Sequence, residues 1–328
     1  MRYKKIEKLD VSISELAIGT WAIGGKGWGD VSDEDSVVTI REMIDQGVNL
    51  IDTAPAYGLG HSEKVVGKAL QDGYRDKVLL ATKLGVNTAE DGEIFINNSY
   101  ERVLTECDQS LERLGVETID IYIIHWPDPN TPIAETMRAL MELKEQGKIR
   151  FTGMSNFDQA GIEEAQQYGA IDFLQLPFSM VNEDSKELLQ WCDAQGIGTM
   201  TYGSLGSGIL TGAIRELPDW PADDSRLTFY DYYREPKFSK IMSLLDFLDE
   251  LAEKYQKTVS QIALNWSTAQ PYVKTAITGV RSPAEAQENA GAFAWTLASE
   301  DITQINHKLK ELEISDGGAF NTSGVRLK

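Results

Sequence analysis

Three short apolar runs each lead into residue types that can do chemistry. Asp52 ends one run, Tyr57 lies in the loop after it, and Lys83 and His125 follow the next two runs. A Tyr hydroxyl has a pKa of about 10, which is high for a proton donor at neutral pH. We expect the neighbouring ammonium group to lower the pKa of Tyr57 and the carboxylate to keep that ammonium charged and fixed.

This set of side chains suits acid catalysis at a carbonyl oxygen. An imidazole such as that of His125 can orient a carbonyl or relay a proton. The sequence shows no nucleophile with a triad pattern, so a bound cofactor is the expected source of hydride. Taken singly, each residue has a structural explanation, and His61 and His307 keep theirs. The hypothesis depends on four different side chains meeting at the ends of adjacent strands.

The elements that position these residues follow from an alternation of short apolar runs and longer amphipathic stretches. Eight runs are too short for buried helices and are bounded by turn residues, which is typical of parallel strands covered on both faces. They span residues 16–18, 49–52, 78–82, 119–124, 149–154, 173–176, 198–201 and 273–277. We predict a single α/β domain over residues 1–328, a closed (β/α)8 TIM barrel, with chemistry at the strand ends. An open doubly wound sheet is the alternative, because periodicity does not reveal closure.

Several boundaries can be predicted from local signals. Gly115 should stop the helix that follows Ser99. Thr131 and Pro132 should be the N-cap and the first residue of a helix that runs to Gly147. A long loop at about 202–240 is rich in Gly, Pro, Asp and aromatic residues, and the next helix should begin near Ile241. A tail begins at about 313. Long loops inside compact domains are usually functional or mobile.

Composition limits the possible partners. The chain has 31 Lys and Arg against 51 Asp and Glu, a formal charge of −20, which argues against nucleic acid and anionic membranes. No apolar stretch is long enough to span a bilayer, and none near the start resembles a signal peptide. The two cysteines, Cys107 and Cys192, cannot form a disulfide framework or a zinc site, so we expect no metal. We expect a cytoplasmic monomer or weak homo-oligomer that acts on a small-molecule carbonyl substrate.

Several motifs, in order over nearly the whole chain, resemble those of the aldo-keto reductase family. They are Gly19-Thr20-Trp21, residues 49–58 with Ser62-Glu63, Ala81-Thr82-Lys83, His125-Trp126, residues 153–157, Gln175 and residues 202–208. The family's catalytic tetrad falls on Asp52, Tyr57, Lys83 and His125 without substitution. The resemblance implies a TIM barrel that reduces the carbonyl of an aldehyde, ketone or sugar with NADPH. Tyr57 would be the general acid.

The resemblance also implies a set of cofactor contacts. Ser155, Asn156 and Gln175 would hydrogen-bond the carboxamide, and Tyr202 would stack on the nicotinamide ring. The whole set comprises Gly19, Thr20, Trp21, Ser155, Asn156, Gln175, Tyr202, Gly203, Ser204, Leu205, Gly206, Ser207, Gly279, Val280, Arg281, Glu285 and Asn289. Arg281, with the hydroxyl of Ser282, offers a cation to a 2′-phosphate, which favours NADPH/NADP+ over NADH. Glu285 stands where many members have Gln.

Aromatic residues are expected to wall the substrate pocket. The candidates are Trp21, Trp28, Trp126 and Phe178. The long loop adds Trp220, Phe229, Tyr230, Tyr232 and Tyr233, which either pack on one another or face the substrate. The glycines at 24–29 do not have the spacing of a dinucleotide-binding fingerprint and are interpreted as a pocket loop.

A second function remains compatible with these residues. The chain could be a nucleotide-binding regulatory protein that resembles the β-subunits of potassium channels. An intact tetrad fits both functions, because the fold alone does not decide the activity.

Overall fold

Eight parallel strands close into a barrel in the computed structural model, which describes residues 1–24, 32–89, 93–220, 227, 230–280 and 282–315. The strands, in their order around the barrel, are β3 (Leu16–Gly19), β4 (Leu50–Asp52), β5 (Leu79–Leu84), β8 (Ile119–Ile124), β9 (Ile149–Ser155), β10 (Phe173–Pro177), β11 (Gly198–Tyr202) and β12 (Thr275–Gly279). β12 pairs with β3, which closes the ring. All eight predicted strands are confirmed, and closure decides against the open sheet.

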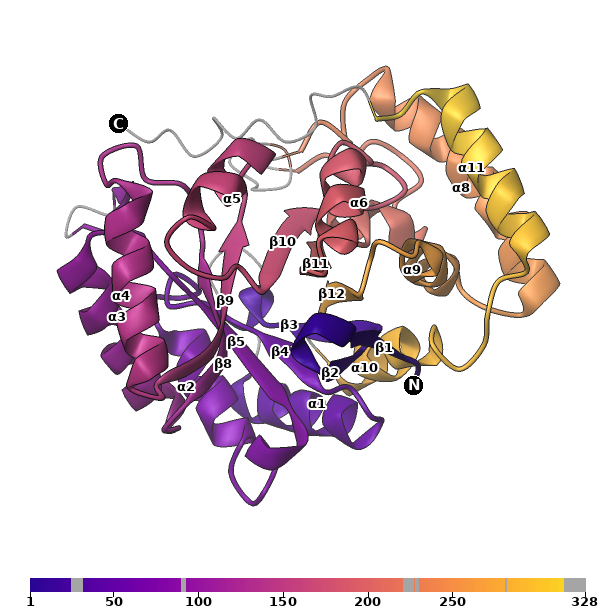
Figure 1. Ribbon diagram of the computed structural model, residues 1–328. Coiled ribbons are helices and arrows are strands. Elements are labelled where there is room, and N and C mark those ends of the chain that lie inside the picture. The colour runs from indigo at the N-terminus through magenta and orange to yellow at the C-terminus, as the bar shows by residue number, and fades with distance from the viewer. Residues whose placement is uncertain (25–31, 90–92, 221–226, 228–229, 281, 316–328) are drawn as a thin grey trace.

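Helices surround the strands (Figure 1). The α-helices are α1 (Asp33–Asp45), α2 (His61–Ala69), α3 (Tyr100–Leu114), α4 (Ile133–Glu145), α5 (Gln159–Ala165), α6 (Lys186–Ala194), α8 (Lys237–Tyr255), α9 (Val259–Ala269), α10 (Pro283–Gly291) and α11 (Ser299–Leu312). Short 3-10 turns are η1 (Glu7–Leu9), η2 (Trp21–Gly24), η3 (Arg75–Lys77) and η4 (Gly206–Thr211). Among the residues described, no helix has the length and apolar character needed to cross a membrane.

Helix boundaries match the sequence signals with two corrections. Gly115 ends α3 in the left-handed conformation, with φ of 66°, as predicted. The prediction that Thr131 caps α4 was wrong. Pro132 is the N-cap, and the Thr131 hydroxyl donates to Asp128 at 2.7 Å instead. The helix after the long loop begins at Lys237, so the loop's last residues belong to α8 rather than preceding it.

Two antiparallel hairpins escaped the sequence analysis. β1 (Tyr3–Ile6) and β2 (Val11–Ser14) form the first, and β6 (Val86–Thr88) and β7 (Ile94–Ile96) form the second, between β5 and α3. Their strands have three or four residues, too few for a period-2 pattern to emerge. Ile6, Val11 and Ile13 of the first hairpin pack with the residues inside the barrel. The hairpin therefore covers the amino-terminal mouth of the barrel.

The apolar residues form two separate cores. A small cluster inside the barrel includes Ala17, Leu50, Ala81, Ile123 and Phe173. A larger cluster fills the space between the strands and the surrounding helices. Because successive side chains in a strand point to opposite faces, each strand contributes to both cores.

The two thiols belong to the outer core. Cys107 and Cys192 are free and fully buried. Burial raises the pKa of both thiols to about 12, so they stay protonated and pack as small apolar groups.

Glu106, on the buried face of α3, places a carboxyl group in the interior. Its side chain is 1% exposed, and Oε2 accepts a hydrogen bond of 2.9 Å from the backbone N–H of Gly85. Burial raises the pKa of Glu106 to about 6, although Gly85 and the Arg102 guanidinium favour the charged form. Since the folded pKa lies above the unfolded one, the stabilising contribution of Glu106 is complete at acid pH and is lost as pH rises through about 6.

We therefore expect Glu106→Gln to stabilise the protein more at alkaline than at acid pH. The amide keeps an acceptor for Gly85 and removes a buried charge. The gain in unfolding free energy, relative to the unchanged chain, should be about 2 kcal/mol larger at about pH 8 than at about pH 4. Urea unfolding across this range measures it. Glu101→Gln, at an exposed position of the same helix, is the matched control. A gain that does not change with pH would contradict the expectation.

Candidate active site

The pleat of the strands explains why the candidate residues meet inside the barrel. Residues two apart in a strand point to the same face. In three neighbouring strands an interior apolar residue precedes a candidate by two positions, in the pairs Leu50 and Asp52, Ala81 and Lys83, and Ile123 and His125. The register pairs Asp52 with Ala81, and Lys83 with Ile123, so each polar side chain lies level with the interior apolar residue of the next strand, and the candidates rise in steps of two residues from β4 to β8. The carboxyl ends of β4, β5 and β8 thus present an acid, an amine and an imidazole together.

The ammonium group of Lys83 is the centre of the site. It is fully buried, and Nζ lies 2.9 and 2.8 Å from the two carboxylate oxygens of Asp52. It also donates to the carbonyl oxygen of Thr53 and to the hydroxyl of Tyr57, each at 3.0 Å. Burial disfavours the charged amine, but the Asp52 carboxylate and Tyr57 outweigh it, so the pKa of Lys83 is raised. Lys83 is therefore a permanent cation at neutral pH.

Tyr57 lies in the loop after β4 and holds its proton firmly. Lys83 lowers the pKa of Tyr57, as expected, but its effect is outweighed. Burial raises the pKa of Tyr57 more than the nearby Lys83 ammonium lowers it, and the Asp52 carboxylate raises it further. The Tyr57 oxygen accepts from Lys83, so its own proton is available for another acceptor. The group is a neutral phenol whose anion would form beside a fixed cation.

His125 lies beside Tyr57, with ring centroids 6.2 Å apart and planes at 82°. Its backbone N–H donates to Leu84 at 3.1 Å, which ties the end of β8 to β5. Burial, and then the Lys83 cation, hold the pKa of His125 well below its usual range. The imidazole is neutral at pH 7 and offers one N–H donor and one acceptor.

The residues expected around the carboxamide make hydrogen bonds within the protein. Asn156, at φ of 64°, donates through Nδ2 to the His125 carbonyl and to Ser155 Oγ, both at 3.0 Å. The Tyr202 hydroxyl donates to Asn156 Oδ1 at 2.8 Å. Gln175 is different, because its amide donates to Asp52 at 2.8 Å. In this structure Gln175 orients the carboxylate that pairs with Lys83.

The loop after β11 has an unusual backbone. Gly206, Ser207 and Gly208 take φ values of 56°, 55° and 95° in succession, a left-handed run that favours glycine. A Cβ at Gly203 or Gly208 would have no atom within 4 Å, so the chain there borders open space. Ser204 Oγ is buried and donates to the Thr201 carbonyl at 3.3 Å, while Leu205 is half-buried.

The end of β3 supports β4 from the neighbouring side. Thr20 donates to the Asp52 carbonyl oxygen through both its backbone N–H, at 3.1 Å, and its hydroxyl, at 3.0 Å. Gly19 packs so closely that a Cβ would lie 2.8 Å from Ile277. Trp21 follows them, is 41% exposed, and lies 6.2 Å from the Tyr57 ring at 29°. Trp21 can therefore form one wall beside the hydroxyl of Tyr57.

The adenosine-end candidates lie where β12 meets α10. Gly279 ends β12, and a Cβ there would have no atom within 4 Å. Val280 is buried, and Ser282 caps α10 by accepting from the N–H of Glu285 at 3.3 Å. Asn289 lies on the same helix and is 6% exposed. Arg281, together with Trp28 and Phe229, lies outside the described residues.

The aromatic candidates lie partly in the apolar core and partly at the carboxyl-terminal mouth of the barrel, the end at which Asp52, Tyr57, Lys83 and His125 meet. Phe178 is fully buried and stacks on Trp266, with centroids 5.6 Å apart, and it also lines a small cavity beside Tyr202. Trp126 is half-buried directly after His125. In the long loop, Tyr230 stacks on Tyr232 at 5.2 Å, and Trp220 contacts Tyr233 at 4.8 Å. The self-packing alternative therefore describes these two pairs.

Tyr230 also approaches the site. With Tyr202, Gly203 and Tyr232 it lines a cavity of about 10 Å³. Its phenol is close enough to Tyr57 and Tyr202 to raise the pKa of both further. Nothing in the spacing of the sequence signals this approach, because Tyr230 comes from a loop far along the chain.

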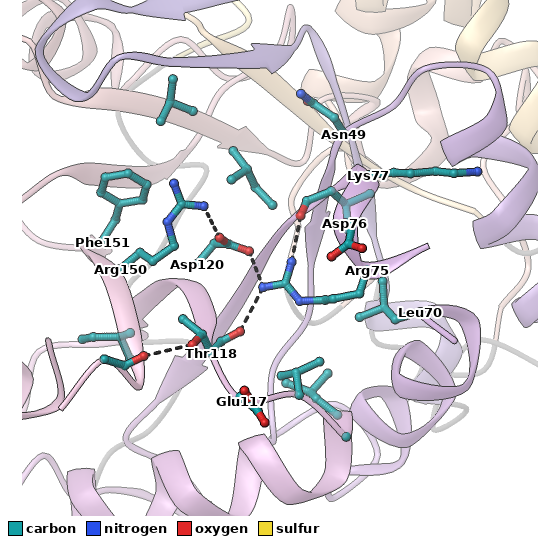
Figure 2. A pocket seen from close by; sticks show the side chains of 18 of the residues that line it. Asn49, Leu70, Arg75, Asp76, Lys77, Glu117, Thr118, Asp120, Arg150 and Phe151 are labelled. Carbon is teal, nitrogen blue, oxygen red and sulfur yellow. Dashed lines mark hydrogen bonds and ion pairs between the residues drawn. The ribbon is translucent and has the colours of Figure 1, made fainter. Parts of the chain in front are cut away.

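A larger cleft, of about 1270 Å³, lies at the opposite end of the barrel. Arg75 and Arg150 reach the buried carboxylate of Asp120 from two sides, at 2.7 and 2.6 Å (Figure 2). Lys77 and Lys144, which also line it, pair with Asp45 and Asp172. Each of these four cations already has a carboxylate partner, so the described residues of the cleft offer no uncommitted cation to an anionic ligand.

Comparison with known proteins matches this arrangement. The model of the Aldo/keto reductase family matches residues 15–310. Aldo-keto reductase YhdN of Bacillus subtilis (strain 168) is 38% identical over 96% of both chains, and the NADH-specific methylglyoxal reductase of Escherichia coli (strain K12) is 36% identical over 93% of this chain and 97% of its own. The structure of glycerol dehydrogenase AKR11B4 from Gluconobacter oxydans superposes with a TM-score of 0.88 at 35% identity, over 96% of this chain and 97% of that one. The chain therefore belongs to the aldo/keto reductase family of oxidoreductases.

Proposed function

We propose that this chain reduces the carbonyl group of an aldehyde, ketone or sugar to an alcohol with NADPH. The main observation in support of this proposal is the hydrogen bond of 3.0 Å from Lys83 Nζ to the Tyr57 hydroxyl. Lys83 also binds Asp52 and Thr53, so it has no further proton to offer and directs the Tyr57 proton toward the mouth. The whole chain, residues 1–328, serves as one catalytic domain.

The residues at the mouth fit a nicotinamide nucleotide. Tyr202 offers a ring, Asn156 and Ser155 offer polar groups, and the backbone around Gly203 and Gly208 borders open space that a ligand can approach closely. When bound, the nucleotide supplies or accepts the hydride. These residues hold and orient it at the ends of β9 and β11.

Tyr57 supplies the proton. Its hydroxyl donates to the carbonyl oxygen as negative charge develops there, and the phenolate that remains is stabilised by Lys83 at 3.0 Å. Asp52 fixes Lys83 and keeps it charged. The neutral imidazole of His125, whose pKa is held low, orients the carbonyl by donating an N–H and does not compete for the proton.

The choice of nucleotide depends on charge. One relative is named for NADH specificity, and the chain carries −20, which opposes the extra phosphate of NADPH. We favour NADPH because Arg281 precedes the Ser282 cap of α10, where a guanidinium and the amino end of a helix both attract a phosphate. NADH is the second candidate.

The mouth suits a small substrate. Trp21 lies beside the phenol and Trp126 directly follows His125 in the chain, an arrangement that accepts a small carbonyl compound beside Tyr57. The names of the relatives, a methylglyoxal reductase and a glycerol dehydrogenase, support small oxygen-rich compounds. Steady-state NADPH oxidation with methylglyoxal, dihydroxyacetone, simple aldehydes and aldose sugars tests the proposal. Absence of turnover with all of them would favour the regulatory function.

Tyr57→Phe should lower kcat by about 10²-fold or more, because a positioned acid contributes about that much. Nucleotide binding should not change, since the ring remains. Steady-state assays of carbonyl reduction measure kcat, and fluorescence titration measures nucleotide binding. Tyr168→Phe, which removes the hydroxyl of a tyrosine that is 48% exposed, is the control. Reduction at the original rate by the Tyr57→Phe variant would remove Tyr57 from the mechanism.

Arg281→Ala should weaken NADPH binding by about 10- to 150-fold, the effect of losing one charge-assisted contact. NADH binding should change little, and the loss should shrink as salt screens the contact. Arg138→Ala, at an exposed position on α4, makes the same change in net charge and separates the local contact from the general field. Equal losses for the two nucleotides would show that Arg281 does not bind the 2′-phosphate.

A further inference from the structure

A buried asparagine connects two of the strands that carry the tetrad. Asn98 lies after β7 and immediately before Ser99, the N-cap of α3, and is 2% exposed. Three of its polar groups contact the chain after β8. Nδ2 donates to the Trp126 carbonyl at 2.9 Å, the backbone N–H donates to Asp128 at 2.9 Å, and the carbonyl accepts from Thr136 at 2.8 Å.

The same side chain packs against the end of β5. Gly85 follows Lys83 by two residues and has φ of 96°, and a Cβ there would lie 1.9 Å from Asn98 Oδ1. The Gly85 carbonyl accepts from the N–H of Asn97 at 2.9 Å. Asn98 therefore lies between a residue two after Lys83 and a residue one after His125.

The Asn98 amide is a poor choice for stability alone. Within the described part of the chain, its buried Oδ1 has no hydrogen-bond partner. Unpaired buried acceptors are unfavourable, and an apolar side chain of similar size would avoid this penalty. What the amide adds is one directed hydrogen bond to the backbone that carries His125 and Trp126.

We propose that Asn98 is a positioning residue for carbonyl reduction, because its amide holds the Trp126 carbonyl and so fixes the His125 imidazole and the Trp126 indole at the mouth. The inference depends on the proposed function above. Asn98 makes its hydrogen bonds to Trp126, Asp128 and Thr136, none of which is among the residues expected to bind the nucleotide. Its loss should therefore affect turnover and leave nucleotide affinity alone.

Asn98→Asp replaces the donor with a carboxylate that repels the Trp126 carbonyl. At about pH 8 we expect kcat to fall about 10-fold, since small displacements of a catalytic group are costly. The carboxylates around position 98 are Asp128, Glu135 and Glu106, and the cations in this region are Arg102 on α3 and Arg138 on α4, which lies over the Tyr100 ring. Like charges and burial should raise the pKa of the new carboxyl group. Once protonated, this carboxyl group can donate to the Trp126 carbonyl. The kcat of Asn98→Asp, divided by that of the unchanged chain, should therefore rise again as pH falls. The kcat of Asn98→Ala should be reduced at every pH.

Asn265→Asp is the matched control. Asn265 is fully buried, and its amide donates to the carbonyls of Ala292 and Trp295, both at 2.9 Å, between α9 and the segment after α10. This variant should lower the melting temperature but keep kcat within about twofold. All rates are measured below the melting transition of each variant, alongside nucleotide affinity.

If neither variant at position 98 folds, Thr136→Val tests the same connection from α4. It removes only the hydroxyl that holds the Asn98 carbonyl and should lower kcat about threefold without changing nucleotide affinity. Three results for the variants at position 98 would overturn the inference. They are a loss of kcat no larger than that of Asn265→Asp, a kcat ratio of Asn98→Asp to the unchanged chain that does not depend on pH, and weakened nucleotide binding. Failure of the unchanged chain to reduce any carbonyl would instead overturn the proposed function, and this positioning role with it.

Discussion

The buried ion pair between Asp52 and Lys83 constrains the rest of the barrel. Two charges inside the apolar interior are unfavourable unless each finds close partners. Lys83 has Asp52, Thr53 and Tyr57, and Asp52 has Lys83 and Gln175. These partners come from β4, the loop after it, β5 and β10, so the pair is satisfied only when the ring of strands is closed in this register. The same contacts that stabilise the charges deliver the phenol of Tyr57 to the mouth.

The two ends of the barrel use buried carboxylates differently. At the amino-terminal end, Asp120 receives two guanidinium groups and a backbone N–H, and both of its oxygens are engaged in holding strands and loops together. At the carboxyl-terminal end, the cation paired with Asp52 has one contact to spare, and that contact is Tyr57. The difference is that the cations around Asp120 are all paired with carboxylates, whereas the cation beside Asp52 also contacts a phenol.

The strand runs and the tetrad could be predicted because both depend on local pattern. Short apolar runs indicated all eight strands, and the parity of the pleat places Asp52, Lys83 and His125 inside. The pKa of Tyr57 could not be predicted, because it depends on how completely the mouth is closed off from water. The side-chain contacts made by Gln175 and Phe178 could not be predicted for a related reason. Their partners, Asp52 and Trp266, are distant in the chain, and only the fold reveals them.

The strands bring the four candidate residues together, and the connecting segments hold the strand ends that carry them. β4 is held by Thr20, which bonds the Asp52 carbonyl twice, and β8 is held to β5 through Leu84 and to Asn156 through the His125 carbonyl. Each of these bonds joins a tetrad residue's backbone to a neighbouring strand or loop. The described part of the segment between β5 and α3 makes no such bond to a tetrad member itself and instead reaches the adjacent positions, Gly85 and Trp126. A barrel of parallel strands fixes the height of its side chains, and the loops fix the direction in which the last side chain of each strand points.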